Sequence, residues 1–235
     1  MTRARSLATR AGRRPTCVPT PVKGRVLPRR RPTVHDNLSS MAHVAEQLPY
    51  GTPMSVEDWV DLAEEIEGEL VDGQLVEEEM NDARHELVVA MLIADLSGWL
   101  RTQAGLVLAS NAKFRLDDRH GRKADLSAYF PGRKPAARGL VRNPPDIAVE
   151  VVSPRPRDVR RDRVEKMREY AAYGVRFYWL VDPEIRSMEV LELGDDGRYR
   201  HALGATEGVI EPPGCPGLRV DLDALWAAVD DLEAQ

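Results

Sequence analysis

The clearest alternation of apolar and polar positions lies in residues 146–154, which read Asp-Ile-Ala-Val-Glu-Val-Val-Ser-Pro. Side chains along a strand point alternately to its two faces, so Ile147, Val149 and Val151 share an apolar face. β-branched residues favour strands, and the prolines on either side bound the run. The pattern predicts a strand buried on both faces. An ionised Glu150 in such a strand is costly unless it is paired or bound to a metal.

Helical spacing of apolar residues predicts two helices before this strand. Ser55-Val-Glu-Asp58 is typical of a helix start, with a hydroxyl cap and an acid three residues later, and helical spacing continues to Ile66. A wide apolar stripe from Leu87 to Leu100 predicts a longer helix. Asn81-Asp82 is expected to cap that helix, and Gly105 is expected to end it.

Shorter apolar runs separated by turn residues predict the other strands. Residues 69–76 read as a hairpin because Asp72-Gly73 is a strong tight-turn signal. Strands are then expected at 106–116 and 123–130, on either side of a polar turn. The three acids at 77–79 are interpreted as a solvated edge, one member of which could face a site.

The second half of the chain continues the alternation of helices and strands. The patterns predict a helix at 158–173, a strand at 175–182, a hairpin at 187–203 and a helix at 222–232. The order is helix, three strands, helix, strand, with β-hairpins at both ends. This order predicts an α/β layered domain with a mixed sheet.

Charge divides the 235-residue chain unevenly. Residues 1–40 hold nine arginines and Lys23 against a single acid, Asp36, and show no apolar periodicity. We interpret residues 1–50 as a disordered basic tail and 51–235 as a single domain. The tail is either a nucleic-acid-binding arm or a solvated tail, or it is an upstream extension if synthesis begins at Met41 or Met54.

The remainder of the chain is acidic, with 23 basic against 37 acidic residues in 41–235. This balance counts against a duplex-DNA binder, although a local basic groove could survive the average. No apolar run reaches the roughly 18 residues that span a membrane. Cys17 and Cys215, the only cysteines, indicate neither a disulfide framework nor a thiolate metal site. We expect a cytoplasmic protein with no membrane partner.

Two carboxylates are expected to meet in the sheet. The strands on either side of the 131–145 loop can pair antiparallel, and pairing Leu126 with Val149 brings their apolar faces together. The same register puts Asp125 opposite Glu150, with Cβ atoms about 5 Å apart. Unpaired carboxylates repel each other, and a divalent cation resolves the conflict because Mg²⁺ accepts one or two of them.

Lysine is scarce in this chain, with five lysines against 28 arginines, and Lys166 lies on the helix directly after the Glu150 strand. A lysine can exchange a proton where an arginine cannot. From residue types alone, Asp125, Glu150 and Lys166 fit two interpretations equally: a metal site or a structural buried ion network.

These residues, together with their surroundings, resemble the Uma-two family of restriction-endonuclease-like proteins in the PD-(D/E)XK nuclease superfamily. The resemblance covers about residues 50–230 and rests on Ala-Asp-Leu-Ser at 124–127, Pro-Pro-Asp-Ile-Ala-Val-Glu-Val-Val-Ser-Pro at 144–154, Lys166, Tyr170, Gly174-Val175 and Tyr-Trp-Leu-Val-Asp-Pro at 178–183. The chain departs from the superfamily at Val152, which stands where a lysine is usual, and Lys166 matches the family's relocated lysine.

The resemblance implies a restriction-endonuclease-like core and a Mg²⁺-dependent phosphodiesterase site, with Mn²⁺ as a substitute. Asp125 and Glu150 would bind the metal, aided by the Val151 carbonyl, and Lys166 would position or activate the attacking water. Supporting roles are expected for Tyr170 and for His85, which otherwise reads as a surface or capping residue. The first motif acid is either Glu69 or Glu86.

The resemblance implies a nucleic-acid partner, DNA before RNA, and a homodimer is compatible with the exposed hairpin. The rival hypothesis is a catalytically inactive nuclease fold that binds nucleic acid or a protein, motivated by the acidic body. A third hypothesis is hydrolysis of another phosphodiester, since a fold does not fix its substrate.

Overall fold

The computed structural model describes residues 50–63, 66–78 and 81–234. The chain divides into two units, Met1–Gln47 and Leu48–Gln235, and all described residues belong to the second unit. The expectations for the basic tail therefore fall outside the described part of the chain. Glu79, one of the three acids after the first hairpin, falls outside it as well.

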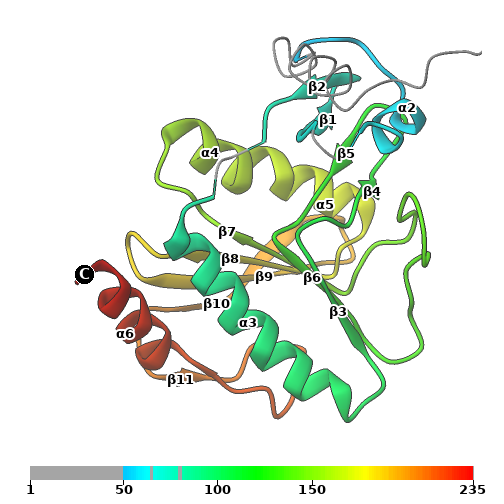
Figure 1. The fold of residues 1–235 in the computed structure, drawn as a ribbon. Helices are drawn as coiled ribbons and strands as arrows, with labels where there is room; N and C mark the ends of the chain where they lie inside the picture. The colour runs from blue at the N-terminus through cyan, green and yellow to red at the C-terminus, as the bar shows by residue number, and fades with distance from the viewer. Residues whose placement is uncertain (1–49, 64–65, 79–80, 235) are drawn as a thin grey trace, which may run out of the picture. The chain divides into compact units, whose positions relative to one another are not determined.

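The strand expected at residues 146–154 is β7 (Ile147–Val151), and it lies inside a six-stranded mixed sheet with every residue buried (Figure 1). Strands β7 and β8 run parallel, and the other neighbours pair antiparallel. The spatial order is β10 (Tyr199–Ala205), β9 (Ser187–Leu193), β8 (Phe177–Asp182), β7, β6 (Leu126–Tyr129) and β3 (Leu106–Ala109). The mixed α/β architecture confirms the predicted fold class.

Helices cover both faces of this sheet (Figure 1). On one face, α3 (Ala83–Arg101) and α6 (Leu222–Glu233) share a buried core with Ile147, Val149 and Val151. On the other face, the helical segment that joins β7 to β8 buries Tyr170 against Ala148. The alternation along β7 thus serves two cores, which explains why the strand is apolar on both sides.

A second, smaller sheet of four strands carries Glu69, one of the predicted site residues. Its order is β2 (Gln74–Val76), β1 (Glu69–Val71), β5 (Gly121–Arg122) and β4 (Phe114–Arg115). The Asp72-Gly73 turn is confirmed, because both residues have positive φ, 52° and 74°. Gly121 is needed here, since a Cβ would lie 2.4 Å from the ring of buried Trp59.

Two of the expected strands differ from the prediction. The strand predicted at 106–116 is divided into β3 and β4, which belong to different sheets. Of the strand predicted at 123–130, only Leu126–Tyr129 forms a strand, β6, while β5 lies just before the predicted start. The chain changes sheets between β5 and β6, and β5 is held by Leu70 on β1. Asp125 therefore precedes β6 instead of lying within it.

The helix bounds also differ from expectation. α2 (Val56–Val60) is a single short helix, although the predicted Ser55 cap and capping box are present. α3 ends at Arg101 with Thr102 as its C-cap, so the prediction for Gly105 was wrong. The helix predicted at 158–173 begins two residues earlier and comprises α4 (Pro156–Arg160), a π-helix η1 (Arg161–Lys166) and α5 (Met167–Tyr173). Among the described residues, no helix is long and apolar enough to cross a membrane.

Candidate active site

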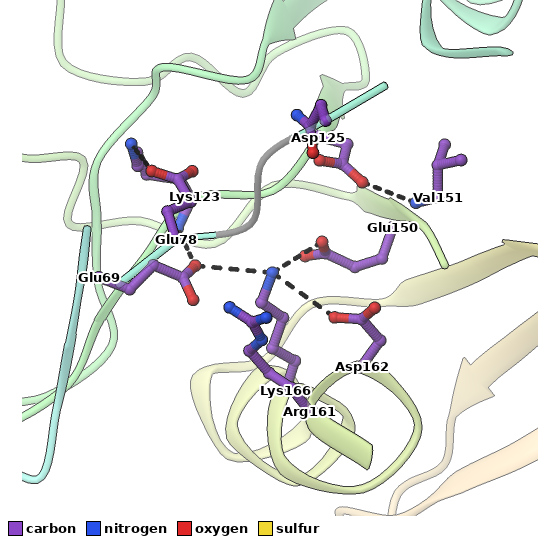
Figure 2. A pocket seen from close by; sticks show the side chains of 10 residues that line it. Glu69, Glu78, Lys123, Asp125, Glu150, Val151, Arg161, Asp162 and Lys166 are labelled. Atoms are coloured by element: carbon purple, nitrogen blue, oxygen red, sulfur yellow. Dashed lines mark hydrogen bonds and ion pairs between the residues drawn. The ribbon is translucent and has the colours of Figure 1, made fainter. Parts of the chain in front are cut away.

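A small polar cavity lies where the C-terminal end of β7 meets η1 and the smaller sheet (Figure 2). Its volume is about 20 Å³, which is room for one water-sized occupant. Charged and polar groups line it: Glu69, Glu78, Asn81, Lys123, Asp125, Glu150, Val151, Arg161, Asp162 and Lys166. The site therefore gathers side chains from both sheets and from one helical segment.

Strand pairing brings Asp125 to this cavity. β6 and β7 pair with Leu126 opposite Val149, which confirms the register predicted from the sequence. Asp125 Oδ2 accepts a hydrogen bond of 2.7 Å from the Val151 backbone N–H and lies 3.1 Å from His85 Nε2. The carboxylate is thus fixed from two sides while remaining 16% exposed.

Glu150 is held at both carboxylate oxygens. Lys166 Nζ donates to Oε2 at 2.8 Å, and the Tyr170 hydroxyl donates to Oε1 at 2.9 Å. Burial raises the pKa of Glu150 well above its ordinary value, and the charges of Asp125, Asp162 and Glu69 act in the same direction. Lys166 only partly offsets them. Glu150 is therefore a carboxyl group whose ionised form needs more positive charge than Lys166 supplies.

Lys166 lies at the centre of the acids (Figure 2). Besides its bond to Glu150, its Nζ is 3.6 Å from Glu69 Oε1 and 3.7 Å from Asp162 Oδ1. Burial alone would lower the pKa of Lys166, but Glu150, Glu69 and Asp162 outweigh burial and raise it well above the ordinary value. In this arrangement Lys166 keeps its proton at neutral pH.

Glu69 connects the smaller sheet to the site. Its Oε2 accepts from Arg122 Nη1 at 2.7 Å, and its Oε1 accepts from the Lys123 backbone N–H at 2.9 Å. Burial opposes ionisation, but Lys166 and Arg122 prevail and lower the pKa of Glu69 to about 2. Arg122 also binds Glu169 on α5, so the same guanidinium links the smaller sheet to the helix that carries the lysine.

The π-helical turn decides which side chains of this helix face the cavity. In an α-helix, residues five apart are rotated by about 140° relative to each other. The i→i+5 bonds of a π-helix widen the turn and bring residues five apart onto one face. Arg161 and Lys166 are five apart, and both line the cavity together with Asp162. Such turns occur frequently at functional sites.

Of the two candidates for the first motif acid, the structure brings only Glu69 to the cavity. Glu86 is in the first turn of α3 with its side chain 64% exposed and accepts a hydrogen bond from Asn81. His85 is buried beside Asp125 instead of lying on the surface. Val151 contacts Asp125 through its backbone N–H, and the role that the resemblance implies for its carbonyl stays a prediction.

Several residues that line the cavity were missed by reasoning from sequence: Asn81 beyond its capping role, Lys123, Arg161 and Asp162. Asp162 could have been found, because it stands one helical turn before Lys166 and matches the i, i+4 spacing of an ion pair. Arg161 could not, because α-helical periodicity places it on another face. Glu78, from the acidic run after the hairpin, does face the site and pairs with Lys123.

The mixed sheet with helices on both faces belongs to the class of α/β folds found in restriction-endonuclease-like proteins. A family model described as "Uma2: Putative restriction endonuclease" matches residues 56–224. The chain belongs to this Uma2 family, which confirms the resemblance drawn from the sequence.

A crystal structure described as "a putative nuclease belonging to DUF820" from Anabaena variabilis is similar in fold. The TM-score is 0.61 with 15% sequence identity, over 75% of this chain and 99% of that chain. At this identity the likeness concerns the fold. No curated protein matches the chain in sequence.

Proposed function

We propose that this protein is a metal-dependent nuclease that hydrolyses phosphodiester bonds of nucleic acid, DNA before RNA. The observation that carries the proposal is the convergence of Asp125, Glu150 and Lys166 on one buried polar cavity. Membership of a family described as "Putative restriction endonuclease" supports it, and so does a fold shared with a protein described as "a putative nuclease".

The charge of the cavity fits a divalent cation. Five carboxyl side chains and three cationic side chains line it, so the acidic groups outnumber the basic ones. Among the described residues no group of three or more His, Cys, Asp or Glu is arranged to hold a metal ion. Mg²⁺ does not require one, because it is usually bound through one or two carboxylates and keeps several waters. Asp125 and Glu150 would hold Mg²⁺, or Mn²⁺ in its place, with the Val151 carbonyl as a further oxygen donor.

A divalent cation bound there would supply a water of lowered pKa and would stabilise charge on a phosphoryl oxygen. The chain's own residues prepare the site for it. Lys166 and Tyr170 fix the Glu150 carboxylate, and His85 with the Val151 N–H fixes that of Asp125. Because these two carboxylates are fixed before substrate binds, the groups that they hold would stay close to the geometry that the reaction needs.

Lys166 acts in this proposal as a cation and not as a base. Because the surrounding acids hold its proton, Lys166 can orient the attacking water or stabilise negative charge on the phosphate. It cannot accept a proton from the water in that state. Of the two roles expected from the sequence, positioning is therefore the one we propose.

Cleavage assays test the proposal directly. Plasmid DNA, linear duplex, single-stranded DNA and RNA are incubated with the full chain in Mg²⁺, in Mn²⁺ or in EDTA. We expect cleavage that needs the metal and falls at least about 100-fold in Asp125→Asn and in Glu150→Gln. Glu192→Gln changes a half-buried acid on β9 far from the cavity lining, is the matched control and should cleave like the wild type.

Two results would contradict the proposal. Cleavage that persists in both site variants would mean that the site is elsewhere. Metal-independent binding without turnover of any nucleic acid would favour the inactive binding module instead.

A further inference from the structure

The segment that follows β7 is the most arginine-rich part of the described chain. Residues 155–163 contain five arginines and two aspartates, whereas residues 41–235 as a whole are acidic. A protein that binds a phosphate backbone needs local positive charge to do so. This segment, α4 and the start of η1, supplies such charge directly beside the candidate active site.

The two aspartates and two of the arginines in this segment have structural partners. Asp158 is fully buried and binds Arg161, whose side chain is 8% exposed in the cavity wall. Arg163 binds Glu189 at 2.5 Å and Asp182 at 3.1 Å, which ties the helix to β8 and β9. Both aspartates are buried, Asp158 against Arg161 and Asp162 in the cavity beside Lys166, so neither acid is exposed on the outer surface of the segment.

The other three arginines face solvent: Arg155, Arg157 and Arg160. Arg157 is 3.8 Å from Glu77 and donates to buried Asp158 at 3.2 Å, and Arg160 is 3.2 Å from Glu165. The pairs with Glu77 and Glu165 lie at the surface. Exposed ion pairs of this kind contribute little to stability, so they are easily exchanged for a stronger anion. The fold therefore depends little on the charges of Arg155 and Arg160, whereas Arg157 also contacts buried Asp158.

The exposed arginines are continuous with the cavity. Arg157 stands four residues before Arg161, so in a helical segment the two lie on the same face. Arg157 also lies beside Glu77, whose neighbour Glu78 lines the cavity. A path of guanidinium groups thus runs from the surface of α4 to the wall of the site.

We propose that Arg161, together with Arg155, Arg157 and Arg160, binds consecutive phosphates of a nucleic-acid strand and leads that strand to the cavity. This inference rests on the proposed nuclease function and names its substrate-binding surface. Arginine suits the role because its planar fork binds phosphate oxygens in pairs. Asp158 holds the Arg161 guanidinium in place, so Arg161 is the member nearest the reacting phosphate.

Equilibrium binding in EDTA tests the surface without any need for turnover. The probe is a fluorescein-labelled 30-mer, single-stranded or duplex, titrated with the full chain at several salt concentrations. We expect Arg155→Gln/Arg157→Gln/Arg160→Gln to weaken binding at least about 10-fold at low salt. The slope of log affinity against log salt should fall by about two to three, one for each lost phosphate contact.

A matched triple variant removes the same charge elsewhere. Arg176, Arg198 and Arg200 are exposed at the opposite end of the main sheet, beside the start of β8 and in the β9–β10 hairpin. Arg176→Gln/Arg198→Gln/Arg200→Gln should change affinity less than about threefold and leave the salt slope unchanged. Arg161→Lys, which keeps charge but loses the fork, should weaken binding less than the α4 triple variant and slow cleavage at saturating substrate.

The outcomes separate this inference from the proposed function. Three results would overturn the phosphate path. The two triple variants could bind with equal affinity, the wild type could fail to bind nucleic acid, or polyglutamate could compete fully for the binding surface. If no substrate is cleaved yet the α4 variant alone loses affinity, the path stands and the nuclease proposal fails. If cleavage occurs and the α4 triple variant binds like the wild type, the nuclease proposal stands and the phosphate path fails.

Discussion

Lys166 Nζ donates a 2.8 Å hydrogen bond to Glu150 Oε2, and the two side chains are only 7% and 2% exposed. Glu150 lies near the end of β7 and Lys166 at the end of η1, with α4 between these elements in the chain. A charge pair this deeply buried is costly to separate, since either partner alone is an uncompensated charge. The pair therefore links the stability of the fold to the chemistry of the site.

Removing the lysine charge should destabilise the protein strongly. We expect Lys166→Met to lower the free energy of unfolding by about 3–5 kcal/mol, because it leaves buried acids without their cation. The double variant Lys166→Met/Glu150→Gln should recover part of the lost free energy of unfolding and should remain inactive. Urea unfolding at neutral pH measures both. A loss below about 1 kcal/mol for Lys166→Met would contradict the buried charge pair.

The hydroxyl of Tyr170 can be removed without changing the shape of the site. Tyr170→Phe loses one hydrogen bond to Glu150 Oε1, which should cost about 1.5–3 kcal/mol of stability and slow cleavage about 10-fold or more. Tyr173→Phe is the control. Tyr173 lies on the same helix as Tyr170, but its hydroxyl donates to the Val141 carbonyl and not to Glu150. Cleavage by the control should match the wild type; equal rates for both variants would leave Tyr170 without a positioning role.

Two substitutions at Asp125 should separate folding from metal binding. Asp125→Asn keeps an acceptor for the Val151 N–H, so its thermal unfolding should stay close to that of the wild type. Asp125→Ala leaves that buried N–H unpaired and should cost about 1–3 kcal/mol. Titration calorimetry with Mg²⁺ should show weakened binding in both. Wild-type metal affinity in Asp125→Asn would exclude Asp125 as a ligand.

Glu69 should make stability depend on acid pH. Its pKa is lowered from 4.5 to about 2, mainly because Lys166 and Arg122 outweigh the opposing effect of burial. Since the folded value is the lower one, ionised Glu69 stabilises the fold above about pH 4.5 and loses this effect as pH falls toward 2. At 1.36 kcal/mol per unit, the contribution is about 3 kcal/mol.

Glu69→Gln should therefore be less stable than the wild type at neutral pH, and its stability should change less between pH 4.5 and pH 2. Denaturant unfolding at fixed pH values measures the difference. Parallel curves for the two proteins over this range would show that the ionisation of Glu69 does not stabilise the fold.

Those parts of the site that depend on strand periodicity could be predicted from the sequence. Alternation along residues 146–154 located Glu150, and apolar matching with Leu126 fixed the register that brings Asp125 to it. A side-chain period of two leaves few alternatives, because a slip of one residue exchanges the faces.

Other parts depend on where the chain changes sheets or alters its helical period. Nothing local marks Lys123–Asp125 as the crossing between the two sheets, so a single strand was expected there. The choice between Glu69 and Glu86 needed the position of the smaller sheet. The π-helix has no signature in the apolar pattern, and with it Arg161 was missed.

The wide turn of η1 makes spacing as important as residue identity. Removing or adding one residue between Arg161 and Lys166 would rotate Lys166 by about 100° relative to Arg161. Every acid and base of the site would still be present, yet Arg161 and Lys166 could no longer meet in one cavity. Segment length should consequently be under stricter constraint here than composition, and length variants of this loop and helix are where related chains would lose or gain activity.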